Sequence, residues 1–226
     1  RIIALDLPEP SAELDDPGFD LRELRRVATS LDHEDAGLAL TAVAMGAWHR
    51  SMRHCPRCGA PLEAEEAGWV LRCTEEGTQN FPRTDPAVIM AVRDGRDRLL
   101  LARNARFRGT FHSVLAGFVE PGETLEAAVA REVAEEVGVL VEEVEYAGSQ
   151  PWPFPRSLML GFRAWARTDQ DAVLDLQDEE IAEAAWYTRE EVTAALAEGR
   201  LSVPSTASIA RGLIEDWYGG PLPAEH

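Results

Sequence analysis

The 226-residue sequence has little cysteine, few basic residues and no long apolar run. Three cysteines are an odd number and too few for a disulfide framework, and two of them form a Cys-x2-Cys pair at Cys55 and Cys58. This pattern favours a metal site in a reducing compartment. The longest nearly apolar run, Ala36 to Trp48, is too short to cross a bilayer, and no signal peptide is found. We therefore expect a soluble, cytoplasmic protein with no membrane partner.

Basic charge is also scarce. The chain has 22 basic and 40 acidic residues, a net charge of −18. This balance argues against general affinity for nucleic acid or anionic membranes, and an anionic substrate would need local cations at its site. With 45% hydrophobic residues, the chain can build one good core and a smaller appended module. Because Arg1 is not a natural start, we expect the native beginning to lie upstream.

What the sequence does contain is one stretch, residues 117–139, in which glycine, arginine and glutamate recur at fixed spacings: GFVEPGETLEAAVAREVAEEVGV. A helix is predicted after Gly122, with Thr124 as its N-cap and Gly138 as its stop. The apolar residues that would face the core recur every four positions, at Leu125, Val129, Val133 and Val137.

Three glutamates share one face of this predicted helix. At about 100° per residue, Glu132, Glu135 and Glu136 fall within an arc of roughly 100°. Such an oxygen-rich cluster suits Mg²⁺ or Mn²⁺. The alternative is a solvated acidic face. That alternative requires neither a glycine at each end nor an arginine eight residues after an isolated glutamate, as Arg131 follows Glu123.

Residues 54–82 form a different unit. Cys55 and Cys58 have the form of a zinc knuckle, in which a tight turn brings two thiolates to one tetrahedral ion. A second knuckle is expected about fifteen residues later, where Cys73 stands.

The fourth ligand of such a site should lie three residues after the third cysteine, and that position is Glu76. A carboxylate can bind Zn²⁺, so a Cys3Glu site is predicted, with His54 as a less well placed substitute. The alternative is a degenerate ribbon that keeps its shape without zinc. In both cases the expected role is structural.

Strand patterns begin at Asp85. Apolar runs at 87–92 and 99–101 flank a turn signal and predict a hairpin. A further strand is expected from Phe111 to Val119, where it leads into the predicted helix.

Three arginines, Arg103, Arg106 and Arg108, lie between these strand patterns. Two interpretations are open: a solvated basic edge, or a contact between one arginine and a substrate phosphate. His112 follows them. A single histidine beside a strand is more often structural than catalytic, and no role is assigned to it.

Residues 149–157, SQPWPFPRS, join two more strand patterns at 139–146 and 158–165. By composition alone the segment fits a polyproline ligand for an SH3- or WW-type partner. The functional interpretation is a rigid loop whose prolines hold Trp152 and Phe154 as aromatic surfaces for a ring. An amphipathic helix predicted at 207–217 would close the site.

The 117–139 stretch resembles the Nudix box, and every defining position is filled: Gly117, Glu123, Arg131, Glu132, Val133, Glu135, Glu136, Gly138 and Val139. With the knuckles before it and SQPWPFP after it, the chain resembles the NADH pyrophosphatase subfamily over about residues 54–217. The resemblance implies an α+β Nudix fold, a mixed β-sheet sandwiched between α-helices. We expect a partial N-terminal accessory domain at 1–53, a zinc-ribbon-like module at 54–82 and the Nudix catalytic domain at 83–226.

The expected metal site follows in two steps. From the residues themselves, Glu132 and Glu136 are the principal Mg²⁺ or Mn²⁺ ligands, and Glu135 is the third ligand or the base. The resemblance adds the backbone carbonyl of Ala116 and a downstream glutamate that best matches Glu180, with its neighbour Glu179 as the alternative. The structural positions of the box are Gly117, Glu123, Arg131 and Gly138, of which Glu123 and Arg131 are expected to pair.

By resemblance, the substrate is NADH or NAD⁺, split by metal-activated water to nicotinamide mononucleotide and AMP. NAD-capped RNA 5′ ends are a further implied substrate, and a homodimer that shares the pocket between chains is implied as well. The residues implied to line the pocket are Phe81, Phe118, Gln150, Pro151, Trp152, Pro153, Phe154, Pro155, Arg156, Ser157 and Ala210. Phe81 departs from the usual tyrosine, so a hydroxyl contact there is lost.

Two other functions remain open from the sequence. One is a broader Nudix hydrolase that acts on ADP-ribose or another dinucleotide. The other is a non-catalytic module that binds nucleotide or RNA. The intact glutamate set argues against the second, because a binding module has no need to keep it.

Overall fold

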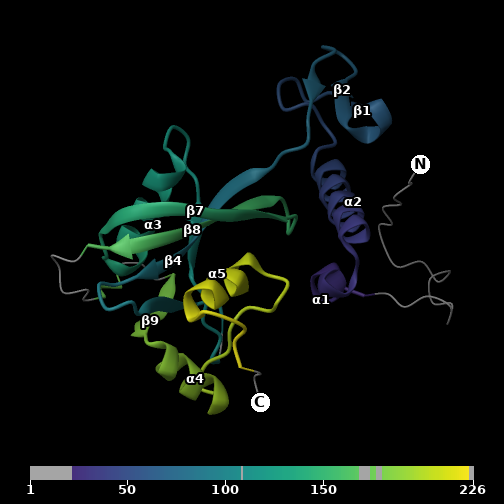
Figure 1. Cartoon of the computed structure of the whole chain (residues 1–226). Helices are drawn as coiled ribbons and strands as arrows, with labels where there is room; N and C mark the ends of the chain where they lie inside the picture. The colour runs from purple at the N-terminus through teal and green to yellow at the C-terminus, as the bar shows by residue number, and fades with distance from the viewer. Residues whose placement is uncertain (1–21, 108, 168–173, 177–179, 224–226) are drawn as a thin grey trace. The chain divides into compact units, whose positions relative to one another are not determined.

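The chain forms two compact units in a computed structural model that describes residues 22–107, 109–167, 174–176 and 180–223 (Figure 1). The first unit contains Arg1–Thr84 and Pro151–Ser157, and the second contains Asp85–Gln150 and Leu158–His226. Within the described residues, every helix is too short or too polar to span a bilayer.

The first unit begins with two helices, α1 at Leu24–Val27 and α2 at His33–Ser51. Asp32 caps α2 by accepting a hydrogen bond from the backbone N–H of Asp35 at 2.8 Å. The chain between the helices forms a 3₁₀ turn at Ala28–Ser30. There the Ser30 hydroxyl donates to the carbonyl of Val27 at 2.7 Å, which competes with continuation of the helix.

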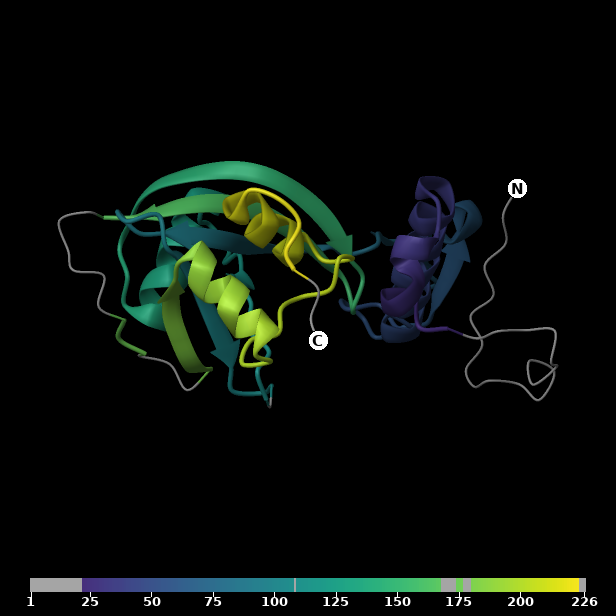
Figure 2. The same cartoon turned by 60° about the horizontal axis from the view of Figure 1, so that its bottom comes forward.

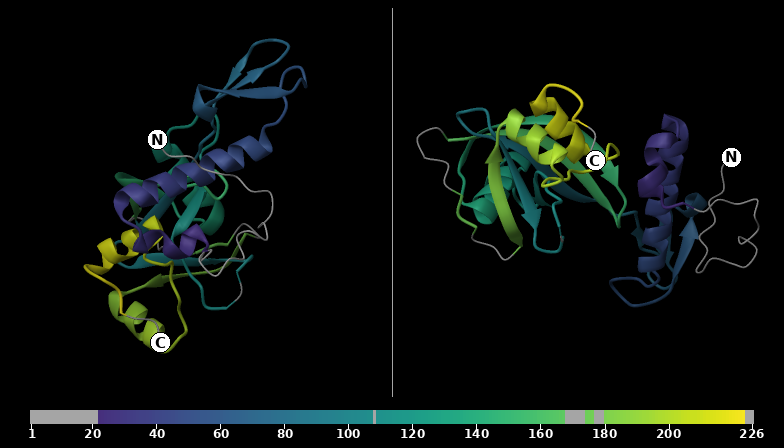
Figure 3. Two further views of the ribbon diagram at one scale, coloured as in Figure 1. Left: turned by 90° about the vertical axis from the view of Figure 1, so that its right-hand side faces the viewer. Right: turned by 90° about the horizontal axis from the view of Figure 1, so that it is seen from below.

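A small ribbon follows, with strands β1 at Leu62–Glu65, β2 at Val70–Cys73 and β3 at Gln79–Asn80 (Figure 3). Its order is β1-β2-β3, and both pairs are antiparallel. The turn between β1 and β2 is a 3₁₀ segment at Glu66–Gly68. Helix α2 is tied to this turn because Nε2 of His49 lies 2.8 Å from the carbonyl oxygen of Gly68.

The second unit is built on a six-stranded sheet with the order β7-β8-β4-β5-β9, in which β6 pairs with β4. The strands are β4 at Asp85–Arg93, β5 at Leu99–Asn104, β6 at Leu115–Phe118, β7 at Val141–Trp152, β8 at Ser157–Ala166 and β9 at Ile181–Tyr187. Three helices accompany it: α3 at Leu125–Val137, α4 at Arg189–Ala197 and α5 at Ile209–Tyr218.

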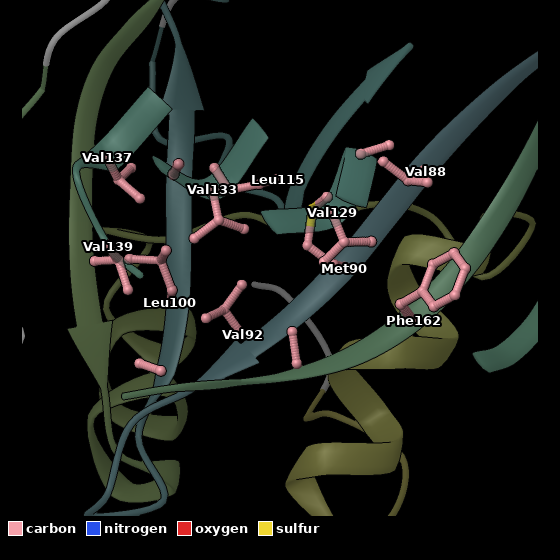
Figure 4. Packing of buried hydrophobic residues seen from close by; sticks show 14 of the residues in the cluster. Val88, Met90, Val92, Leu100, Leu115, Val129, Val133, Val137, Val139 and Phe162 are labelled. Atoms are coloured by element: carbon pink, nitrogen blue, oxygen red, sulfur yellow. The ribbon is translucent and has the colours of Figure 1, made fainter. Parts of the chain in front are cut away.

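Helices cover both faces of this sheet, as the expected layered fold requires. The valines of α3 pack with alternate residues of β4, namely Val88, Met90 and Val92 (Figure 4). The intervening β4 residues, Ile89 and Ala91, pack with residues of α4 and α5. These two helices lie on the opposite face of the sheet from α3 (Figure 2). Because both sides of β4 are buried over residues 87–92, this part of the strand is apolar throughout rather than alternating.

Two of the expected strands have a different length in the structure. The expected strand 111–119 is regular only at β6, because its first half bridges two different neighbours: Phe111 pairs with Ser202 and Ser113 with Ala102. Strand β7 extends further than expected, into the proline-rich segment and through Pro151. Proline is tolerated there because β7 is an edge strand of the sheet.

Candidate functional site

Strand β6 delivers the chain to the box helix through a short, tightly bonded loop. The Glu123 carboxylate accepts a hydrogen bond from the backbone N–H of Glu120 at 2.7 Å. Thr124 then caps α3 by accepting from the N–H of Ala127 at 3.2 Å. The helix ends at Gly138, whose φ of 71° lies in the left-handed region that favours glycine.

Arg131 is the centre of the polar contacts around the box. Its guanidinium bonds both oxygens of Glu123, at 3.1 and 2.7 Å, and donates to the backbone carbonyl of Phe118 at 2.9 Å. Its Nη1 also donates to Glu132 at 2.9 Å and to Glu135 at 3.0 Å. One cation therefore joins the loop to two glutamates of the predicted metal-binding face.

These contacts change the ionisation of the box. The hydrogen bond from Arg131 is the main reason that the pKa of Glu123 is lowered. The same pairing raises the pKa of Arg131, so its charge is permanent. Burial raises the pKa of Glu132 above its ordinary value, and the hydrogen bond from Arg131 opposes that rise only in part.

Gly117 has no side chain for a steric reason. A Cβ at this position would coincide with the carboxylate of Glu132. The carboxylate therefore lies directly against the β6 backbone at Gly117. The preceding residue, Ala116, carries the carbonyl that is the expected ligand. Only glycine allows α3 to place an acid so close to the strand.

The three helix glutamates differ in environment. Glu136 is buried, with 6% of its surface exposed, whereas the side chain of Glu135 is 60% exposed. Among the described residues, the one group of three or more acidic, histidine or cysteine side chains close enough to share an ion is the cysteine trio of the ribbon. The glutamates thus share the helix face without converging on one point.

The donor set still fits a hard divalent cation. The carboxylates of Glu132, Glu135 and Glu136 and the carbonyl of Ala116 offer only oxygen, which is the ligand type that Mg²⁺ and Mn²⁺ prefer. The Glu132 carboxylate fills the space beside Gly117, the residue that follows Ala116 in β6.

The downstream glutamate, Glu180, is exposed and precedes β9. Its carboxylate accepts a hydrogen bond from the side-chain amide of Asn104 at 2.9 Å, and its carbonyl accepts from the N–H of Ala105 at 2.7 Å. Asn104 was not predicted as a site residue, because its partner lies 76 positions away and no local pattern connects them. The alternative ligand, Glu179, lies outside the described residues.

The basic cluster separates into different environments. Arg103 is paired with Glu183 at 3.1 Å, whereas Arg106 is exposed and Arg108 lies outside the described residues. His112 is buried, and its Nδ1 lies 2.9 Å from the carbonyl oxygen of Thr110. These contacts agree with the structural interpretation of the histidine.

The SQPWPFP segment forms the tip of the β7–β8 hairpin. Trp152 and Phe154 form an edge-to-face pair with ring centroids 5.3 Å apart. Gln150 is engaged by the chain itself: its Nε2 donates to the carbonyl of Ala207 at 2.7 Å, and its Oε1 accepts from the N–H of Ile209 at 2.8 Å. The amide therefore holds the start of α5.

The other predicted pocket residues fall in both units. Phe81 belongs to the first unit together with residues 151–157, and Phe118, Gln150 and Ala210 belong to the second. Phe81 and Phe118 are each 60% exposed, whereas Ala210 is buried. Within 151–157, Pro153 is buried and Pro151 and Pro155 are exposed, while Arg156 and Ser157 are half-buried.

The ribbon brings its three thiols together. The Sγ atoms of Cys55, Cys58 and Cys73 all lie within 4.8 Å of one another, which suits a soft ion such as Zn²⁺. Hydrogen bonds from the backbone N–H groups of Cys58 and Arg57 lower the pKa of Cys55 to about 7. Although the Ala60 N–H acts to lower it, the neighbouring thiols raise the pKa of Cys58 to about 11.

The predicted fourth ligand is not part of this group. The carboxylate of Glu76 lies 3.6 Å from Nε of Arg57, and His54 is outside the group as well. Thr78, which was not predicted, has its hydroxyl 3.7 Å from the Sγ of Cys55.

A glycine-containing loop leads into a helix that carries three glutamates on one face, beside a sheet that helices cover on both faces. This is the arrangement of a Nudix domain. The NUDIX domain model matches residues 83–205, the NADH pyrophosphatase zinc ribbon domain matches 50–80, and the NADH pyrophosphatase-like rudimentary NUDIX domain matches 1–48. The chain belongs to the Nudix hydrolase family, as an enzyme of the NADH pyrophosphatase type with its zinc ribbon.

Similar proteins agree with this membership. An NAD-capped RNA hydrolase NudC of Mycobacterium tuberculosis (strain H37Rv) is 47% identical over 219 residues, covering 92% of this chain and 68% of the relative. The human NAD-capped RNA hydrolase NUDT12 is 42% identical over 200 residues, covering 83% of this chain and 42% of the relative. A crystal structure of a NUDIX hydrolase from Nitrosomonas europaea has a TM-score of 0.57 at 23% identity, covering 76% of this chain and 97% of that one. It shows the shared fold.

Proposed function

We propose that this chain hydrolyses the diphosphate bridge of NADH or NAD⁺, releasing nicotinamide mononucleotide and AMP. The observation that carries the proposal is the position of the Glu132 carboxylate, pressed against Gly117 at the end of β6 and held by Arg131. This contact supports a metal site at the junction of β6 and α3, to which we assign the Ala116 carbonyl and the other α3 glutamates as well.

The residues have distinct roles in this reaction. Glu132, Glu136, Glu180 and the carbonyl of Ala116 hold Mg²⁺ or Mn²⁺, and Glu135 is the third helix ligand or accepts the proton of the attacking water. When bound, the metal neutralises phosphate oxygens and lowers the pKa of a water ligand. Arg131 and Glu123 keep the loop fixed, so the ligands need no rearrangement as charge develops.

Substrate choice is assigned to the hairpin tip. The rings of Trp152 and Phe154 offer aromatic surface for a base or nicotinamide ring, with Phe81 and Phe118 as further exposed aromatics. The SQPWPFP segment and the two relatives named as NAD-capped RNA hydrolases support NAD as the recognised group. We extend the proposal to NAD caps on RNA 5′ ends, with the cap rather than the RNA body as the recognised part.

The proposal also covers the metal of the ribbon, the oligomeric state and the location of the protein. We propose Zn²⁺ as the structural ion of the ribbon, a homodimer that completes the pocket, and a cytoplasmic location. The zinc proposal is supported by the three gathered thiols.

Product analysis tests the function directly. The chain is incubated with Mg²⁺ or Mn²⁺ and with NADH, ADP-ribose or a diadenosine polyphosphate, and the nucleotide products are separated. We expect nicotinamide mononucleotide and AMP from NADH at the highest kcat/KM. Faster turnover of ADP-ribose would replace the proposal with a broader Nudix hydrolase. Binding without turnover of any of the three would indicate a non-catalytic module.

A further inference from the structure

The two knuckles of the ribbon share one backbone pattern. In the first, the N–H of Gly59 donates to the carbonyl of Cys55 at 2.9 Å, and in the second the N–H of Gly77 donates to the carbonyl of Cys73 at 3.0 Å. Both glycines have left-handed φ values, 77° and 67°. The second turn is therefore built as a metal knuckle, although it carries one cysteine instead of two.

The second knuckle lacks the second thiol of a complete zinc ribbon. Glu76 occupies the position that Cys58 has in the first knuckle, and its backbone N–H lies 3.4 Å from the Sγ of Cys73. The Glu76 side chain lies 3.6 Å from the Arg57 guanidinium and outside the group of gathered ligand atoms.

The three thiols fit a zinc ion without large movement. Tetrahedral bonds of about 2.3 Å place sulfur atoms about 3.8 Å apart, and the Sγ atoms of Cys58 and Cys73 are 3.4 Å apart. Beside them, the Thr78 hydroxyl lies 3.7 Å from the Sγ of Cys55. A neutral hydroxyl there can hydrogen-bond to a thiolate or to a water on the ion.

The contact with Arg57 favours leaving the carboxylate out, because coordination of zinc by Glu76 would remove its carboxylate from the guanidinium 3.6 Å away. Structural zinc sites normally have four protein ligands, whereas three protein ligands leave a position for water or another molecule.

We propose that the ribbon binds Zn²⁺ through Cys55, Cys58 and Cys73 only, and that the fourth position holds an exchangeable water that a small external thiol can replace. The proposal is independent of the diphosphatase activity, because the site lies in the ribbon and its test measures the metal itself.

The test replaces zinc with Co²⁺ in the full chain and records thiolate-to-cobalt charge-transfer absorption. Titration with 2-mercaptoethanol should raise this absorption by about one third, as three sulfur ligands become four. The variant Glu76→Cys should start at the higher intensity and show no increase. Glu76→Gln should behave as the unmodified chain does, as should the control Glu75→Gln.

Several results would overturn the proposal. A changed cobalt spectrum or at least tenfold weaker metal binding in Glu76→Gln alone would make the glutamate a ligand. A titration in which 2-mercaptoethanol leaves the spectrum unchanged or extracts the metal would exclude an exchangeable position. Binding of less than half an equivalent of Zn²⁺ would exclude the site altogether. Even if Glu76→Cys misfolds, the titration of the unmodified chain and the Glu76→Gln comparison decide the question.

Discussion

Single residues decide where the carboxylates of the box lie. Gly117 provides the space for the Glu132 carboxylate, and Arg131 holds that carboxylate with those of Glu123 and Glu135. The pattern of the sequence identified each of these residues. It did not indicate that Arg131 reaches beyond Glu123, because a spacing shows which residues share a face and not which of them bond.

Gly117→Ala should abolish most of the activity. The new methyl group would occupy the position of the Glu132 carboxylate, so we expect kcat for NADH to fall by about 10² or more, the range typical of a disturbed metal site. The matched control is Gly37→Ala in α2, where a Cβ meets nothing within 4 Å. There we expect full activity and about 0.5–1 kcal/mol of added stability. Equal activity of the two variants would contradict the role of Gly117.

Glu136→Gln should separate catalysis from folding. The substitution removes a buried carboxyl group of the predicted metal-binding face while keeping its shape, and we expect kcat to fall by about 10² or more because a metal ligand is lost. Steady-state kinetics with NADH measure the effect, and circular dichroism checks the fold. Glu126→Gln, an exposed change on the same helix, should leave kcat unaltered. Wild-type turnover in Glu136→Gln would remove Glu136 from the metal site.

At the level of elements, the β4–β5 turn shows how a buried charge is used for structure. Asp94 is 7% exposed and accepts hydrogen bonds from the N–H groups of Arg96 and Arg98, at 2.9 and 2.8 Å. The Arg98 guanidinium adds a bond at 2.7 Å. Burial acts to raise the pKa of Asp94, but these bonds outweigh it and hold the pKa below its ordinary value.

Asp94→Asn should therefore destabilise the protein in a pH-dependent way. A carboxyl with a lowered folded-state pKa adds stability above its unfolded pKa, which is about 3.9, and loses it as the pH falls through the folded value. We expect a loss of about 1–3 kcal/mol at pH 7, shrinking in acid below about pH 4. Urea unfolding at several pH values measures this, with the exposed Glu143→Gln as control. A difference that stays constant with pH would refute the explanation.

The same scale shows what local sequence can predict. The N-cap Thr124 and the left-handed Gly138 bound α3 as expected, because both signals act within the helix itself. The prediction of a full strand at 111–119 was wrong, since its first half bridges chain segments far away in sequence. The contact between Gln150 and the start of α5 could not be predicted from local sequence either. Its two hydrogen bonds join residues that are separated by 57 and by 59 positions in the chain.

At the scale of the whole molecule, the net charge of −18 opposes binding of the protein to the phosphates of an RNA body. A protein that grips several RNA phosphates loses affinity steeply as salt displaces those contacts. For this chain we expect kcat/KM on NAD-capped RNA to change by less than about tenfold between 50 and 200 mM salt. The same series with NADH is the control. A steep decline with RNA alone would reveal a basic RNA-binding surface that the overall charge conceals.

The Arg131 bridge has a consequence for how metal and folding are coupled. A cluster of carboxylates without a metal normally repels itself, but here a permanent internal cation already neutralises part of the charge on Glu123, Glu132 and Glu135. The box helix can therefore persist when the divalent ion is absent. We expect chelation by EDTA to stop turnover while the α-helical circular dichroism of the protein remains, and added Mg²⁺ to restore activity without refolding. The metal-free enzyme would already be folded. Its activity would therefore depend on the concentration of free divalent ion and not on a refolding step.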